Sequence, residues 1–293
     1  MPIRHYRRIF ETCEPYLVAR APVARRLDKR PLDVPIPPAN IIDPQRLGHE
    51  TFISLLQHVN DLTHGPLGLP MPDWVFYDCA VMPGAVFGFA RRARGLEPWF
   101  RRALRVPDGY DGLVPVSIFI CIPTVSRDAA LVYTLCSANQ VAVGIAPEGL
   151  WRLTLALGIT AFSLHHMMAV MQWRSEQLGL FAGLGPLELI TAWTPAHDNP
   201  ASATFRVATP QSAVERLLRG DITGAEGIDA YVDADDFRDL QAVQRRIEAG
   251  ERIAVAGPAE IRGAATRVPL QIRDAHTPFD LTPDIGYTRR FQG

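Results

Sequence analysis

Lysine is almost absent from this chain of 293 residues: Lys29 is the only lysine among 30 basic residues, and the others are arginine. A reaction that needs a Schiff-base lysine in the core is therefore nearly excluded. The formal net charge is only −1, so the basic excess of a general nucleic-acid binder is missing as well. We expect no nucleic-acid partner, and the arginine bias is typical of a GC-rich coding sequence.

Cysteine is also scarce, with four residues, Cys13, Cys79, Cys121 and Cys136. None forms a C-x-x-C pair or has a histidine at zinc-ligand spacing, so we predict no metal held by cysteine. Reduced, buried thiols and the lack of an apolar signal segment near Met1 favour a cytoplasmic protein.

The longest uncharged stretch lies between Arg152 and Arg174 and has 21 residues. It is long enough to span a bilayer, but Gly158, His165 and His166 are among the residues that interrupt its apolar character. We therefore predict no membrane span.

The distribution of proline and of apolar periodicity predicts three parts. Residues 1–47 are rich in arginine and proline, and we expect an N-terminal arm, extended over the surface between Pro31 and Pro44. Residues 48–209 read as a core, and residues 210–293 as a C-terminal α/β extension with a loosely attached tail. The predicted class is α+β, with a mixed, mostly antiparallel central sheet flanked by helices.

Within the core, helical spacing of apolar residues predicts a helix over 48–64. The other expected elements follow in order: strands over 74–80 and 85–90 joined as a hairpin by the turn at 82–84, a basic helix over 96–106, strands over 114–122 and 130–137, a glycine turn over 139–146, a helix over 147–157, a strand within 161–173, a short helix within 174–185, and strands over 187–193 and 201–208.

The extension begins with helical spacing over 212–219 and again over 235–249. Asp233 or Asp235 is the expected N-cap of the second helix, and Gly250 its stop. Strands are expected over 252–256 and 266–272.

This order of elements resembles the GNAT-type acyltransferases, which move an acyl group from coenzyme A to an amine. In that family a Gln/Arg-x-x-Gly-x-Gly/Ala turn before a helix binds the pyrophosphate. The matching segment here, from Gln140 to Ala146 with Gly144 inside it, is one residue longer. The resemblance also implies a tyrosine acid, but Phe181 occupies that position and cannot donate a proton.

The resemblance and the exposed amides of a helix start together predict the acyl-CoA contacts. They are assigned to Val143, Gly144, Ile145, Ala146 and Gly149. Glu148 lies in the same turn, where it would favour the helix dipole but repel a pyrophosphate. A glycine turn of purely structural function is the open alternative for Gly144.

The predicted catalytic residues are His166, His197 and Glu148, because acyl transfer needs a group that takes the amine proton. For His166 the alternative is a histidine packed in the core, and for His197 a turn capped by Asp198 or Asn199. Cys136 reads as a small buried apolar group rather than a nucleophile. Asp78 would be an exposed edge carboxylate, a buried partner of arginine or an active-site carboxylate.

Three functions remain open. The first is transfer of an acyl group from acyl-CoA to a small amine, in a protein that could form a homo-oligomer. The second is a protein that binds a lipid or acyl ligand without reaction. The third is a metal-assisted enzyme that uses His166, His197 and a carboxylate.

Overall fold

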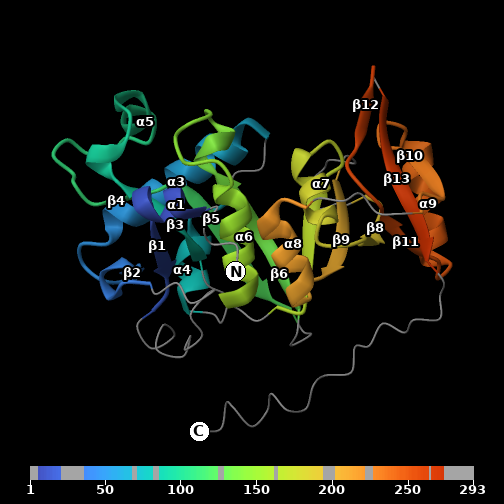
Figure 1. Ribbon diagram of the computed structural model, residues 1–293, viewed down its shortest axis with the longest axis horizontal. Helices are drawn as coiled ribbons and strands as arrows, with labels where there is room; N and C mark the ends of the chain where they lie inside the picture. The colour runs from blue at the N-terminus through green and yellow to red at the C-terminus, as the bar shows by residue number, and fades with distance from the viewer. Residues whose placement is uncertain are drawn as a thin grey trace, which may run out of the picture. The chain divides into compact units, whose positions relative to one another are not determined.

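The structure, a computed structural model, describes residues 6–20, 36–67, 71–81, 86–124, 129–161, 164–193, 202–221, 227–263 and 265–273 (Figure 1). The fold is α+β, with a mixed and mostly antiparallel arrangement of strands, which confirms the predicted class. The chain divides into two compact units. Unit 1 contains Met1–Pro123 and Val132–Ser163, and unit 2 contains Thr124–Leu131 and Leu164–Gly293.

The described helices of unit 1 are α1 (Arg7–Thr12), α3 (Glu50–His64), α4 (Trp74–Val81), α5 (Pro98–Ala103) and α6 (Leu150–Ala161), with short 3₁₀ turns η3 (Pro38–Asn40), η4 (Gly65–Leu67), η5 (Ala93–Gly95) and η6 (Ala138–Gln140). Its strands are β1 (Glu14–Val18), β2 (Ile41–Ile42), β3 (Val86–Arg92), β4 (Leu113–Pro115), β5 (Ser117–Pro123) and most of β6 (Ala129–Ser137). They lie in the order β2-β1-β3-β5-β6, and β4 also pairs with β3. Strands β1 and β2 pair in parallel.

The predicted strand over 114–122 is interrupted at Val116, which separates β4 from β5. The Val116 N–H donates to Phe89 O at 2.8 Å, whereas the Phe89 N–H donates to the Ser117 hydroxyl at 3.0 Å. That hydroxyl also contacts Thr154 Oγ1 of α6 at 2.8 Å. The interruption therefore replaces one ladder hydrogen bond with a buried polar link between the sheet and α6.

Helix α4 replaces a strand that the sequence predicts. Trp74–Ala80 was predicted to be a strand in a hairpin, but it is helical. The buried residues Val75, Phe76, Cys79 and Ala80 repeat at helical spacing, and this places Asp78 on the exposed side. Its aromatic and β-branched composition favours a strand, but the segment is helical because one helical face packs in the core. The predicted turn at 82–84 lies outside the described residues.

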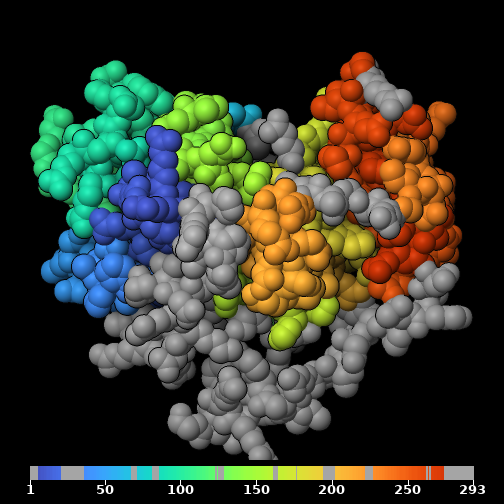
Figure 2. Space-filling model, in the orientation of Figure 1, coloured from blue at the N-terminus to red at the C-terminus, as the bar shows by residue number. Residues whose placement is uncertain are grey.

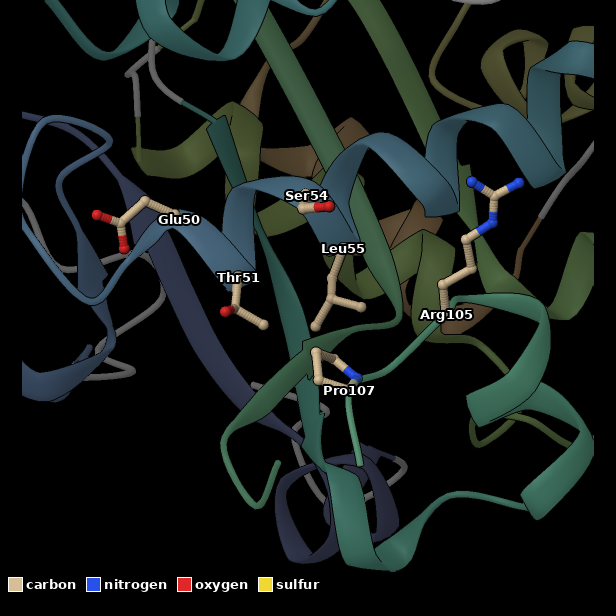
Figure 3. A pocket seen from close by; sticks show the side chains of 6 residues that line it. All are labelled: Glu50, Thr51, Ser54, Leu55, Arg105 and Pro107. Carbon is tan, nitrogen blue, oxygen red and sulfur yellow. The ribbon is translucent and has the colours of Figure 1, made fainter. Parts of the chain in front are cut away.

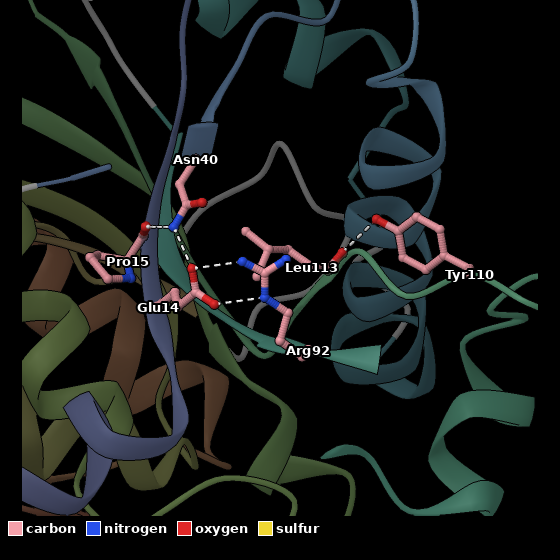
Figure 4. Close-up of polar contacts among 6 residues, drawn as sticks. All are labelled: Glu14, Pro15, Asn40, Arg92, Tyr110 and Leu113. Carbon is pink, nitrogen blue, oxygen red and sulfur yellow. Dashed lines mark hydrogen bonds and ion pairs between the residues drawn. The ribbon is translucent and has the colours of Figure 1, made fainter. Parts of the chain in front are cut away.

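In the region predicted to be an arm, residues 6–20 contain α1 and β1, which belong to unit 1, and residues 21–35 lie outside the described residues. Figure 4 shows how the segment containing Asn40 is attached to β1. Asn40 Nδ2 donates to Pro15 O and to Glu14 Oε2, both at 3.1 Å, and Arg92 Nε donates to Glu14 Oε1 at 2.8 Å. Asn40 is only 2% exposed, so this segment is anchored in unit 1 rather than laid over its surface.

Unit 2 contains β7 (His166–Gln172), α7 (Glu176–Ala182), β8 (Leu187–Thr191), β9 (Ser202–Ala208), α8 (Gln211–Arg219), β10 (Ala230–Asp233), α9 (Phe237–Glu248), β11 (Arg252–Val255), β12 (Glu260–Arg262) and β13 (Ala265–Arg273). The strand order is β7-β9-β8-β11-β13-β10, with β12 paired to β13. Asp236, one residue after the expected Asp235, is the N-cap of α9, since its side chain accepts from the Arg238 N–H at 2.8 Å.

The unit boundaries differ from the predicted boundaries at residues 47/48 and 209/210. Strand β11 of the predicted extension pairs directly with β8 of the predicted core, with Ala254 opposite Glu188. The tail from residue 274 lies outside the described residues. Within the described chain, no helix is both long and apolar enough to cross a membrane. The uncharged stretch instead contributes α6 and β7.

Candidate functional site

The turn that joins β6 to α6 is held in place by its own side chains. At its start, the Ser137 hydroxyl accepts from the Asn139 N–H, and the Ser137 N–H donates to Gln140 Oε1 at 2.9 Å. The Asn139 carboxamide then reaches Ala146, accepting from its N–H and donating to its carbonyl, each at 2.9 Å. The Arg91 guanidinium donates to Ile145 O. These bonds fix the turn in one conformation without any ligand.

Two glycines of the turn adopt left-handed backbone conformations, with φ of +94° at Gly144 and +81° at Gly149. A Cβ atom at Gly144 would meet nothing within 4 Å, so the requirement there is one of backbone conformation alone. At Gly149 it would also lie 3.0 Å from the Tyr6 ring. Figure 2 shows α1 (dark blue), which follows Tyr6, beside the chain at the start of α6 (yellow-green).

Arg152 supplies one positive charge in the first turn of α6, and its guanidinium lies over the Trp151 ring, 5.4 Å from the centroid. The first N–H groups of a helix have no intrahelical partner, and here Arg152 lies among them. Its Nε atom is buried and has no hydrogen-bond partner within the described residues. Burial raises the pKa of Tyr6, and the charge of Arg152 opposes that rise, which shows that the two groups interact. An anion at this corner would meet both the helix start and the guanidinium.

The predicted cofactor residues have unequal access to a ligand. Val143 is 98% exposed at the tip of the turn, and Gly144 is exposed beside it. Ile145 and Ala146 are each only 4% exposed, and the Ala146 N–H is already bonded to Asn139. That amide is therefore not available to a phosphate. Of the five residues, Gly149 is the one that adjoins the start of α6.

Of the three predicted catalytic residues, one lies in unit 1, one in unit 2 and one outside the described residues. Glu148 is exposed, two residues before α6 in unit 1. His166 begins β7 in unit 2, opposite Ala208 of β9, and is half-buried. His197 lies outside the described residues. A site that combines them stays a prediction.

A polar cluster that sequence reasoning missed lies between α3 and β6. His64 is half-buried, with Nδ1 3.0 Å from Thr63 Oγ1 and Nε2 3.2 Å from Thr134 Oγ1. Thr63 Oγ1 donates to Val59 O at 2.9 Å, so it accepts the hydrogen on His64 Nδ1. In that tautomer Nε2 is unprotonated and accepts a hydrogen bond from the Thr134 hydroxyl. Burial lowers the pKa of His64, so the imidazole is neutral at pH 7 and able to accept a proton.

Asn60 lies one helical turn before His64 on the same side of α3. It is 1% exposed, and within the described chain neither its Oδ1 nor its Nδ2 has a hydrogen-bond partner. A buried carboxamide without partners is destabilising, typically by about 1–3 kcal/mol for each unsatisfied group. The available sequence signal was the set of polar residues at 60, 63 and 64 beside the apolar face of the helix.

The cysteine thiols and the potential metal ligands offer no further reactive site among the described residues. Burial raises the pKa of the Cys136 thiol to about 12 and that of Cys79 to about 11, so neither is a thiolate nucleophile at neutral pH. The free cysteines Cys13, Cys79, Cys121 and Cys136 are all buried, as predicted. Among the described residues, no group of three or more His, Cys, Asp or Glu side chains could hold a metal ion.

Unit 1 therefore contains the buried strand, the glycine turn and the helix start that the sequence predicts. Arg152 at the helix start and the neutral imidazole of His64 are additions from the structure. Comparisons with known proteins add no assignment to these features: no family model matches the chain, and no curated protein matches it.

Proposed function

We propose that the protein is an acyltransferase of the GNAT type, which moves an acyl group from coenzyme A to a small amine. The order of elements from β6 through the turn, α6, β7, α7 and β8 to β9 supports this, because it is the order that the resemblance implies. Before β6 the agreement is weaker, since α4 replaces the first strand of the expected hairpin. The observation that carries the proposal is the basic first turn of α6 with the unpartnered Nε of Arg152. The pyrophosphate of coenzyme A is the anion expected there.

The reaction needs a group that accepts the proton of the attacking amine as the thiolate leaves. His64 has a neutral imidazole, which suits a general base, and Nε2 would take the proton once the Thr134 hydroxyl, 3.2 Å away, turns from it. Phe181 is 1% exposed and packs edge-on against Phe205, with ring centroids 5.8 Å apart. It fills the core of unit 2 and supplies no proton, so we assign no acid at that position.

Thermal unfolding with coenzyme A tests the proposal. A ligand present at 100 times its Kd and bound only to the native state stabilises it by about 2.7 kcal/mol. We expect a clear rise in Tm for the natural protein and for Arg94→Gln, which removes one exposed arginine of unit 1. Arg152→Gln should lose most of the rise, and Arg152→Lys should keep part of it. If coenzyme A leaves the Tm of the natural protein unchanged, the proposal is refuted.

One observation favours a second function, binding of an acyl ligand without reaction. Asn139 occupies the Ala146 amide, and Ile145 is buried, so the turn itself offers less to a pyrophosphate than the resemblance implies. Release of free thiol from a series of acyl-CoA compounds separates the two functions. Thiol release that depends on an amine supports transfer, whereas saturable binding without thiol release supports the binding protein.

A further inference from the structure

A pocket of about 260 Å³ lies in unit 1 between the outer side of α3 and the chain that follows α5. It is lined by Glu50, Thr51, Ser54, Leu55, Arg105 and Pro107 (Figure 3). Its surface therefore combines a cation, a carboxylate, two hydroxyls and an apolar portion. The volume is below the roughly 300–1,000 Å³ of sites for drug-sized ligands, so a small molecule fits it.

Arg105 has an unusual backbone conformation. Its φ is +55°, which makes it the only non-glycine residue at positive φ among the described residues. The position is the one that follows the C-cap Leu104 of α5, where the Val106 N–H donates to Arg101 O at 2.9 Å and the Arg105 N–H to Arg102 O at 3.0 Å. Glycine is preferred at this position because it has no Cβ.

Two other helices of this chain end in the same way but use glycine. After α8, Gly220 has φ of +75° and the Asp221 N–H donates to Arg216 O at 3.1 Å. After α9, Gly250 has φ of +92° and the Glu251 N–H donates to Arg246 O at 3.0 Å. An arginine at the corresponding place after α5 shifts the folding equilibrium against the native state by roughly fivefold or more.

The side chain of Arg105 is the feature that glycine would remove. Within the described parts of the chain, its guanidinium makes no hydrogen bond or ion pair, although the residue lines the pocket. Glu50 does not neutralise it: its Oε2 accepts from the Gly48 N–H at 2.7 Å, and Figure 3 shows its carboxylate directed away from Arg105. Among the described residues, the exposed guanidinium of Arg105 at this pocket therefore has no charged partner.

We propose that this pocket binds a small monocarboxylate that carries a hydroxyl group. The Arg105 guanidinium would hold the carboxylate, since its fork of donors matches two carboxylate oxygens. The Ser54 hydroxyl, which points toward the Arg105 side of the pocket in Figure 3, would hydrogen-bond the ligand hydroxyl, whereas the Thr51 hydroxyl points toward Glu50. Glu50 at the edge disfavours a dianion such as phosphate. The inference is independent of the proposed acyl transfer.

Lactate and inorganic phosphate are the two probes, titrated into the full-length protein by calorimetry or NMR. We expect saturable lactate binding, weakened at least tenfold by Arg105→Gly and unchanged by Arg102→Ala, which removes an equal charge one turn earlier. Arg105→Gly should also stabilise the fold, with the folding equilibrium constant raised roughly fivefold.

Three results would overturn the inference: no saturable binding of lactate to the natural protein, equal lactate affinity in Arg105→Gly, or tighter binding of phosphate than of lactate. Because glycine is favoured at position 105, a folding defect does not confuse the test. Arg105→Lys adds a second measurement, since a point charge without the planar fork should bind lactate more weakly than arginine does.

Discussion

Replacement of Glu188 by glutamine should strongly destabilise unit 2. Glu188 lies on β8 and accepts from Arg252 of β11 at 2.9 and 2.7 Å, and it is paired with Arg206 of β9 at 3.1 Å. The side chains are only 15%, 19% and 12% exposed, respectively. One carboxylate therefore balances two poorly solvated guanidinium groups, and it links the strands on either side of β8.

The magnitude follows from the burial of all three groups. Removal of one partner from a buried ion pair costs about 3–5 kcal/mol, and the remaining exposure reduces this to about 2–4 kcal/mol here. Burial alone would raise the pKa of Glu188, but the hydrogen bonds and charges of Arg252 and Arg206 together hold it below its usual value. A carboxyl with a lowered pKa contributes stability above about pH 4.3, and this contribution is lost as pH falls through the folded-state pKa.

Urea unfolding of the natural protein and Glu188→Gln, at pH 7 and in steps below pH 4.3, measures both effects. The stability difference should be largest at pH 7 and should shrink in acid, because a protonated Glu188 resembles glutamine. Glu251→Gln is the control, since its pair with Arg246 is much more exposed, at 41% and 36%. A difference below about 0.5 kcal/mol at pH 7, within the range of ordinary surface substitutions, would refute the reasoning.

Three further predictions concern unit 1. Gly158→Ala should lower the free energy of unfolding by about 1–3 kcal/mol, since its Cβ would lie 2.4 Å from the buried ring of Phe119. Helix propensity alone predicts an increase in the free energy of unfolding, and such an increase would contradict this prediction. Tyr16→Phe should cost about 1–3 kcal/mol in chemical denaturation, because its hydroxyl donates to Ser117 O at 2.8 Å in the core; unchanged stability would show that the bond contributes little. A thiol reagent at pH 8 should leave Cys136 unlabelled until denaturant is added, given its burial and a pKa of about 12, and rapid labelling of the native protein would count against the structure.

Much of the fold was readable from the sequence where one signal dominated. β6 and α6 were predicted because each has a strong apolar pattern, continuous in the strand and periodic in the helix. Trp74–Ala80 failed because its composition favours a strand, whereas its buried positions repeat as in a helix. Such a conflict is resolved only by the surface on which the segment packs, and that surface comes from distant parts of the chain.

The candidate site was predictable in its position but not in its contacts. A glycine turn before a helix is a local pattern, and the sequence placed it correctly between β6 and α6. The proximity of Tyr6 to Gly149, and of His64 to Thr134, joins residues that are far apart in the chain. No spacing rule connects such pairs, because their meeting depends on how α1 and α3 pack.

Ala146 and Arg152 differ in whether their polar groups have hydrogen-bond partners within the protein. Both backbone groups of Ala146 are satisfied by Asn139, as expected for any buried loop, because an unpaired N–H or carbonyl there would destabilise the fold. That bond needs no ligand to explain it. Arg152 Nε is buried in the same unit and stays unpartnered within the described residues, although a single accepting side chain would have satisfied it. The Arg152 guanidinium does have internal support, because it lies over the Trp151 ring, 5.4 Å from its centroid. Only the hydrogen bond of Nε is missing, and under our proposal an external anion beside the helix start would supply it.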